Sequence, residues 1–97
     1  MLVAVLRVDL RIRSSRSLKQ KRHVVKALTT ALRQRFDLSV AEVDHQDLWQ
    51  RAELGAVIVG NQEYHLRKVL HEAQKLVERW DEVELITADI TVMDPDD

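Results

Sequence analysis

The chain has 97 residues, 45% of them hydrophobic and 32% charged, a composition typical of a single globular domain. It contains no cysteine, which excludes disulfides and thiolate chemistry and makes the cytoplasm the simplest compartment. No apolar run approaches the roughly 20 residues that cross a bilayer, so we expect no contact with a membrane.

The net charge of −1 hides a strong asymmetry along the chain. Residues 1–35 contain ten Lys or Arg and one acid, Asp9, whereas residues 36–97 contain five Lys or Arg and fifteen acids. Such asymmetry indicates contact with an anionic partner such as nucleic acid. The alternative is that the two halves neutralise each other in the folded protein.

Two elements are expected in the first third of the chain. Apolar residues recur at every second position from Leu2 to Ile12, which predicts a β-strand with one buried face. Ser17 is the expected N-cap of a helix that reaches about Arg35, and Gln20 completes a capping box with it.

The middle of the chain predicts a β-hairpin, because residues 38–45 and 51–60 are rich in strand-forming side chains and flank a short polar segment. Asn61 is the expected N-cap of a second helix, which reaches about Trp80 and carries one apolar stripe. A last strand is expected over residues 83–92.

The order β-α-β-β-α-β predicts an α+β fold of the ferredoxin-like type, with both helices on one face of a four-stranded antiparallel sheet. Right-handed crossovers place the first and third strands in the centre. We expect a single domain over residues 1–93 and a frayed acidic tail over residues 94–97.

The first helix carries positive charge on one face. Four basic residues lie within about 60° of one another opposite the core, with no acid among them: Lys19, Arg22, Lys26 and Arg33. The second helix mixes both signs on its outer face, as a solvated helix usually does. Four like charges on one face repel each other and cost the helix some stability. An anionic partner would relieve this repulsion, so we expect this face to contact the phosphates of a partner such as RNA.

The start of the same helix is a candidate anion site. Its free backbone N–H groups and its dipole favour a phosphate. Basic and hydroxyl side chains surround it: Arg13, Ser15, Arg16, Ser17, Lys19, Lys21 and Arg22. Lys21 falls among the core-facing positions, which leaves two interpretations. It either extends off the helix end to water, or leans over the end of the first strand toward a bound anion.

Three polar residues gather at the tip of the expected hairpin: Asp44, His45 and Asp47. They form a turn network, a metal or acid–base site, or a contact for a partner. Their spacing matches no zinc signature, which favours the turn. Trp49 follows, and it either closes the edge of the core or offers a flat surface to a base or a protein.

The sheet face opposite the helices has no aromatic side chain at its outward positions in the two central strands. Val3 and Val5 point outward from the first strand, and Val57 and Val59 from the third. Base stacking on the sheet is therefore not expected. Because an open apolar face tends to be covered, we expect a homodimer through this face or through a strand edge.

Two segments resemble a known family. They are "SRSLKQKR" after the first strand and "FDLSVAEVDHQDLWQRAELGAVIVGN" from Phe36 to Asn61. Together they are similar to the YlxP-like family of small bacterial proteins, a domain-of-unknown-function family, and the resemblance spans nearly the whole chain. The family has no established biochemical activity that the resemblance could carry over to this chain. Members are commonly encoded among translation-initiation and ribosome-assembly factors, which implies, by association, a role near the ribosome.

We therefore expect a non-enzymatic RNA- or ribosome-associated binding protein whose first helix contacts phosphates. The alternative is a regulatory or ligand-binding dimer that holds a phosphorylated small molecule at the start of that helix. An enzyme using Asp44, His45 and Asp47 has less support, since the chain has no Gly-rich phosphate loop and no Ser-His-Asp arrangement. No cofactor and no metal ion are expected.

Overall fold

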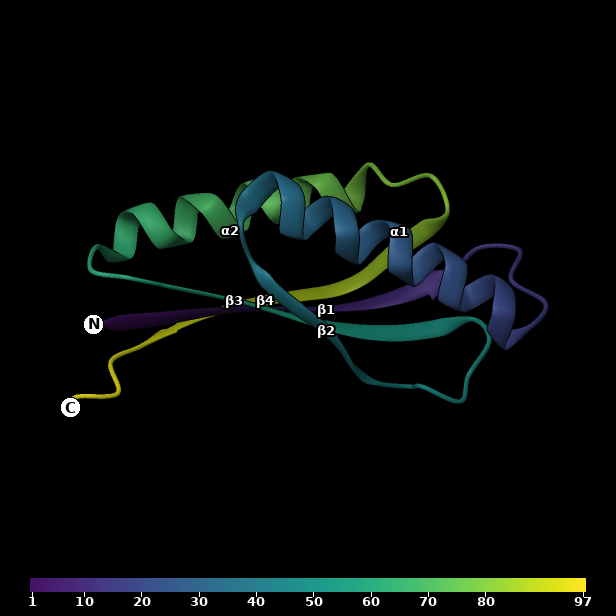
Figure 1. Ribbon diagram of the computed structural model, residues 1–97, viewed down its shortest axis with the longest axis horizontal. Helices are drawn as coiled ribbons and strands as arrows, with labels where there is room; N and C mark the ends of the chain where they lie inside the picture. The colour runs from purple at the N-terminus through teal and green to yellow at the C-terminus, as the bar shows by residue number, and fades with distance from the viewer.

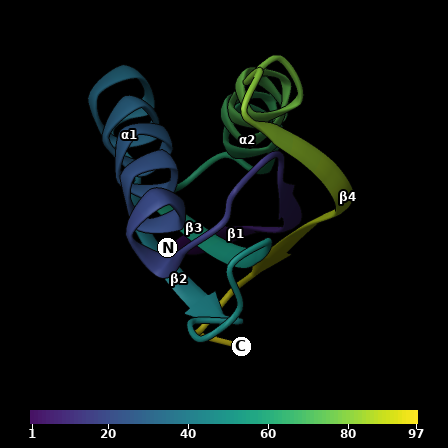
Figure 2. The same cartoon turned by 90° about the vertical axis from the view of Figure 1, so that its right-hand side faces the viewer.

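The computed structural model describes residues 1–97 and contains four strands and two helices. In chain order these are β1 (Leu2–Ile12), α1 (Leu18–Phe36), β2 (Ser39–Asp44), β3 (Arg51–Gly60), α2 (Glu63–Glu78) and β4 (Val83–Met93). The strands form one antiparallel sheet in the order β2-β3-β1-β4, with β1 and β3 in the centre. Both helices cover one face of this twisted sheet and leave the other face open (Figure 1, Figure 2). The predicted α+β, ferredoxin-like fold is confirmed.

The core lies between the sheet and the two helices. β1 buries every second side chain from Ala4 to Ile12, and the fully buried Leu28 of α1 and Leu70 of α2 belong to the same core. Because buried positions recur with period two in strands and 3.6 in helices, each element hides one face and exposes the other. The outer face of α1 is thereby free for a partner.

Two side chains fix the start of α1. Ser17 is the N-cap, as predicted, and its Oγ accepts a hydrogen bond from the backbone N–H of Gln20 at 3.1 Å. The Gln20 side chain reaches back one residue further than a capping box requires, because its Oε1 accepts from the N–H of Arg16 at 2.6 Å. The orphan N–H groups of the first turn are thus partly satisfied within the chain.

The prediction that Asn61 caps α2 is wrong. Gln62 is the N-cap residue, it makes no side-chain cap bond, and the helix begins at Glu63. The start of α2 follows from its packing against the end of β3. A Cβ at Gly60 would lie 2.8 Å from Cδ2 of Leu66, so the absence of a side chain at Gly60 allows Leu66 to pack there. Glu63 then places an acid in the first turn, where the helix dipole favours it.

The chain ends in a turn rather than in extended backbone. The N–H of Asp97 donates to the carbonyl of Asp94 at 3.3 Å, and the N-terminal ammonium of Met1 lies 3.5 Å from Oδ2 of Asp96. Neither α1 nor α2 combines the length and the hydropathy that a membrane-crossing helix needs.

Candidate nucleic-acid interface

Unpaired positive charge concentrates on one part of the chain. Of the 15 Lys and Arg residues, six form ion pairs within 4.0 Å: Arg7, Arg11, Lys21, Arg51, Arg67 and Lys75. Seven of the other nine lie between residues 13 and 35: Arg13, Arg16, Lys19, Arg22, Lys26, Arg33 and Arg35. The acidic second half of the chain therefore forms no ion pair with these seven side chains.

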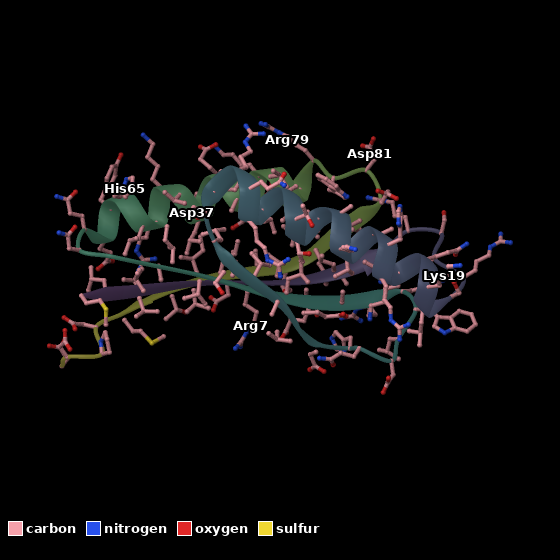
Figure 3. All side chains as sticks on the ribbon, viewed as in Figure 1. Arg7, Lys19, Asp37, His65, Arg79 and Asp81 are labelled. Atoms are coloured by element: carbon pink, nitrogen blue, oxygen red, sulfur yellow. The ribbon has the colours of Figure 1, made fainter.

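The predicted stripe on α1 faces solvent. Lys19, Arg22 and Lys26 are exposed, and the first turn of the helix contains no acid. Figure 3 shows Lys19 projecting at the end of the molecule where α1 begins. Arg33 differs from these three, since its Nη2 donates a hydrogen bond to the carbonyl of Val40 and so ties α1 to β2. The part of the stripe that makes no contact within the chain therefore consists of Lys19, Arg22 and Lys26.

A cavity of about 620 Å³ lies beside the start of α1, against the turn between α2 and β4. Arg13, Lys19 and His23 line one side, and Asp81 and Glu82 line the other. The Nε of Arg13 also donates to the carbonyl of Val83 at 3.4 Å. Because two carboxylates share the cavity, it suits a zwitterionic ligand better than a free phosphate.

Lys21 does not lie where either interpretation placed it. Its side chain is 1% exposed, its Nζ lies 2.8 Å from Oε2 of Glu42, and it donates to the carbonyl of His45. The ammonium is thus shielded and already neutralised, so Lys21 leaves the set of candidate phosphate contacts. Glu42 was missed at the sequence level, although an acid in phase with the inward-facing Val40 of the same strand is a signal for a buried partner.

The hairpin tip is a turn network. His45 has a positive φ of 65°, and its N–H donates to Oδ1 of Asp44 at 2.7 Å. Its carbonyl accepts from the N–H of Leu48 at 3.0 Å, and its Nε2 lies 3.8 Å from Oδ1 of Asp9. Asp47 makes no hydrogen bond or ion pair, and no three His, Asp or Glu side chains converge with metal-binding geometry. The contacts hold Asp44 and His45 in the turn, whereas the Asp47 side chain remains exposed and unpaired.

Trp49 does not close the edge of the core, which corrects the first of the two interpretations. It is 53% exposed, beside Leu48 at 49%, and lines a shallow cavity of about 480 Å³ with Asp47, Gln50 and Arg51. Hydrogen bonds tie the loop to the end of β1 and to the approach to α1.

Gln50 makes that connection, and sequence reasoning did not identify it. Its carbonyl accepts from the N–H of Ile12 at 2.8 Å, and its Nε2 donates to the carbonyl of Ser15 at 3.3 Å. Both views of the ribbon show the β2–β3 loop at the end of the molecule where α1 begins (Figure 1, Figure 2). The exposed tryptophan therefore shares one end of the fold with the unpaired cations at the start of α1, Arg16, Lys19 and Arg22.

The open face of the sheet is different in character. Its charges pair with one another: Arg51 lies 2.7 Å from Asp9 and Arg11 lies 3.5 Å from Glu84. Apolar side chains occupy much of the remainder, namely Val3, Val5, Val43, Val57, Val59 and Met93. This face is nearly neutral and half apolar, whereas the α1 face is basic.

Comparisons with known proteins agree with this fold. The "Uncharacterized protein YlxP" of Bacillus subtilis (strain 168) is 32% identical over 68 residues, which are 70% of this chain and 74% of that protein. The de novo designed protein Foldit4 has a TM-score of 0.54 at 9% identity, with 97% of this chain and 98% of that chain covered. The structural-genomics protein YJCS has a TM-score of 0.52 at 11% identity, with 95% and 99% covered. At such identities, the two structures are similar in fold alone.

The sequence match extends over most of the described elements. Residues 3–90, from β1 into β4, match the family described as "Protein of unknown function (DUF503)". That range includes the basic helix, the buried Lys21–Glu42 pair and the loop that carries Trp49. This chain belongs to the DUF503 family.

Proposed function

We propose that this protein is a non-enzymatic binder of RNA, free or within a ribosomal subunit, and that the exposed face of α1 contacts its phosphates. One observation carries the proposal: Lys19, Arg22 and Lys26 share an exposed helix face and form no ion pair within the chain. Exposed unpaired cations gain most from a polyanion, because each phosphate contact also releases counterions.

The recognition in this proposal is of shape and charge. Phosphate contacts position a protein without reading base identity. The Oδ1 of Asp44 and the backbone N–H and carbonyl of His45 are hydrogen-bonded within the chain, which supports a structural role for these two residues.

A triple variant tests the proposal: Lys19→Gln, Arg22→Gln and Lys26→Gln. Glutamine is a good helix former, so the helix should persist. Affinity for ribosomal RNA and for isolated subunits should fall, and the slope of log K against log salt should flatten by roughly 0.7–0.9 for each phosphate that is no longer neutralised. The matched control removes three cations from the other helix: Arg67→Gln, Lys68→Gln and Lys75→Gln. An equal effect of the two triples, or no effect of the first, would overturn the proposal.

The alternative ligand is a phosphorylated small molecule beside the start of α1. The cavity of about 620 Å³ favours it, but Asp81 and Glu82 on its wall repel phosphate. A single small anion predicts a shallow salt dependence, whereas RNA predicts a steep one. Titration with inorganic phosphate and with RNA at two salt concentrations separates the two.

We also propose that the open face of the sheet binds a second copy of this chain. A nearly neutral face with apolar valines is self-complementary in charge, because each cation on it already has an acid beside it. The basic faces of the two copies would then point away from each other, since the helices lie on the opposite side of each sheet (Figure 2).

A further inference from the structure

We infer that the β2–β3 loop extends the interface into a base-stacking site, in which Trp49 receives an unpaired base of RNA. The flanking phosphates then contact Arg16, Lys19 and Arg22 at the start of α1. This inference rests on the proposed function and specifies its substrate class: single-stranded or looped RNA rather than a continuous duplex.

The first support is the exposure of the loop's apolar side chains. Trp49 is 53% exposed and Leu48 is 49% exposed, in a chain with only one other tryptophan. Leaving a large aromatic surface in water forfeits hydrophobic stabilisation, and an adjacent pair of such residues marks a contact surface.

The second support is that the loop is held in place before any partner arrives. The carbonyl of His45 accepts hydrogen bonds from both Leu48 and Lys21, and Gln50 bridges to the carbonyl of Ser15. A side chain on an ordered loop loses little conformational entropy on binding, and tryptophan has only two side-chain torsions to fix.

The third support is the chemistry of the neighbours. Gln50 follows Trp49, and it is hydrogen-bonded to Ser15, which precedes the exposed Arg16. A flat apolar surface beside unpaired cations matches a nucleotide, which combines a planar base with a phosphate. Bases in a duplex are stacked on each other and are not free to stack on a side chain, so an unpaired base fits this site.

The charge of Asp47 determines on which side of Trp49 the phosphates of the RNA lie. It lines the same shallow cavity as Trp49, and its carboxylate makes no hydrogen bond or ion pair within the chain. A phosphate beside Asp47 would meet a like charge, whereas a phosphate beside the start of α1 meets Arg16 and Lys19. The backbone of the RNA therefore runs along the α1 side of the tryptophan.

The test follows the fluorescence of Trp49 in a Trp80→Phe background. Trp80 is half-buried and its Nε1 has no hydrogen-bond partner, so phenylalanine is a mild replacement. Titration with a single-stranded RNA oligonucleotide should quench the emission of Trp49. A duplex of the same length should bind through α1 without quenching it.

Affinity measurements complete the test. Trp49→Ala should weaken binding of the single strand about 5- to 150-fold, the range expected for one stacked base, and should leave duplex binding unchanged. Trp49→Phe should retain most of the affinity. The matched control is Tyr64→Ala, an aromatic side chain 81% exposed at the start of α2, which should have no effect.

Failure of this inference is distinguishable from failure of the proposed function. If the α1 triple variant loses affinity for RNA while Trp49→Ala does not, the proposed stacking site is wrong and the proposed basic interface is retained. Equal loss for single strand and duplex in Trp49→Ala would also overturn the stacking site. If wild-type protein binds neither form of RNA, the proposed function fails as well.

Discussion

Lys21 of α1 and Glu42 of β2 form a buried ion pair, in which Nζ lies 2.8 Å from Oε2. The lysine side chain is 1% exposed and the glutamate side chain 20% exposed. The same ammonium donates to the carbonyl of His45, so one side chain joins the first helix, an edge strand and the hairpin loop. The pair therefore positions the loop that carries Trp49 relative to α1.

Replacing Lys21 with Met should destabilise the protein by about 2–4 kcal/mol, because it leaves the Glu42 carboxylate without its cation and removes one of the two hydrogen bonds to the His45 carbonyl. The range lies slightly below that of a fully buried pair, since Glu42 keeps some contact with water. Urea unfolding followed by circular dichroism measures the free energy of unfolding. The double variant Lys21→Met/Glu42→Leu should recover most of the loss, and simple additivity of the two single effects would contradict the pairing.

The fold was predictable because its signals are local. Alternating apolar residues in the strands and apolar stripes on the helices predicted the element order, the sheet order and the exposure of Lys19, Arg22 and Lys26. Likewise, Ser17 was recognisable as an N-cap from its own sequence neighbourhood.

The Lys21–Glu42 pair and the exposure of Trp49 were not predictable in this way, because both depend on contacts between distant segments. Val40 and Glu42 pair in regular register with Ala56 and Leu54, so the phase of the strand does place Glu42 on the inward face, and the register shift comes only after it. Periodicity within one strand does not reveal which residue of a distant helix lies opposite, and here that residue is Lys21. The start of α2 was missed for a related reason, since the packing of Leu66 against Gly60 outweighs the capping preference of Asn61.

Ser17→Ala should cost about 1 kcal/mol, because the N–H of Gln20 loses its acceptor. For a domain of this size the melting temperature should fall by roughly 4–8 °C. Ser17→Asp should keep the wild-type melting temperature, since aspartate is an equally good N-cap and its charge suits the helix dipole. Calorimetry on the three proteins measures this, and a stability of Ser17→Ala equal to wild type would show that the cap bond contributes nothing.

Gly60→Ala should destabilise the protein by about 1–3 kcal/mol, because the new Cβ would lie 2.8 Å from Cδ2 of the buried Leu66. Gly55 supplies a matched control within the same strand. A Cβ at Gly55 would lie 3.3 Å from Cγ1 of Val43, which is 48% exposed and free to move outward. Gly55→Ala should therefore change the free energy of unfolding by less than about 1 kcal/mol. Equal losses in the two variants would refute the steric account.

Asp44→Asn and Asp47→Asn should have different effects, although both remove one charge from the same loop. Asparagine at 44 keeps an oxygen to accept the N–H of His45, so stability should change by less than about 0.5 kcal/mol. Removing the carboxylate of Asp47 should strengthen binding of single-stranded RNA by about 1.5- to 5-fold, as expected for loss of one exposed repulsive charge. Urea unfolding measures the stability of Asp44→Asn, and fluorescence anisotropy at low salt measures RNA binding by Asp47→Asn. Weaker binding in Asp47→Asn would show that this carboxylate makes a favourable contact with the RNA, and strengthening well beyond about 5-fold would place the RNA backbone beside Asp47.

The open sheet face should form a homodimer, and Val57→Lys should dissociate it. Val57 pairs with Val5 in the two central strands, so it lies near the middle of the face. In a two-fold dimer a central residue lies close to its own symmetry copy, and two lysines there would repel each other in a poorly solvated interface.

Sedimentation velocity at tens of micromolar should show a dimer for the wild-type chain and a monomer for Val57→Lys. The circular dichroism spectrum should be unchanged, because Val57 does not belong to the core between sheet and helices. Gln34→Lys, which adds the same charge to an exposed position of α1, should remain a dimer. The sheet face is not the dimer interface if the wild-type chain sediments as a monomer, or if Gln34→Lys dissociates and Val57→Lys does not.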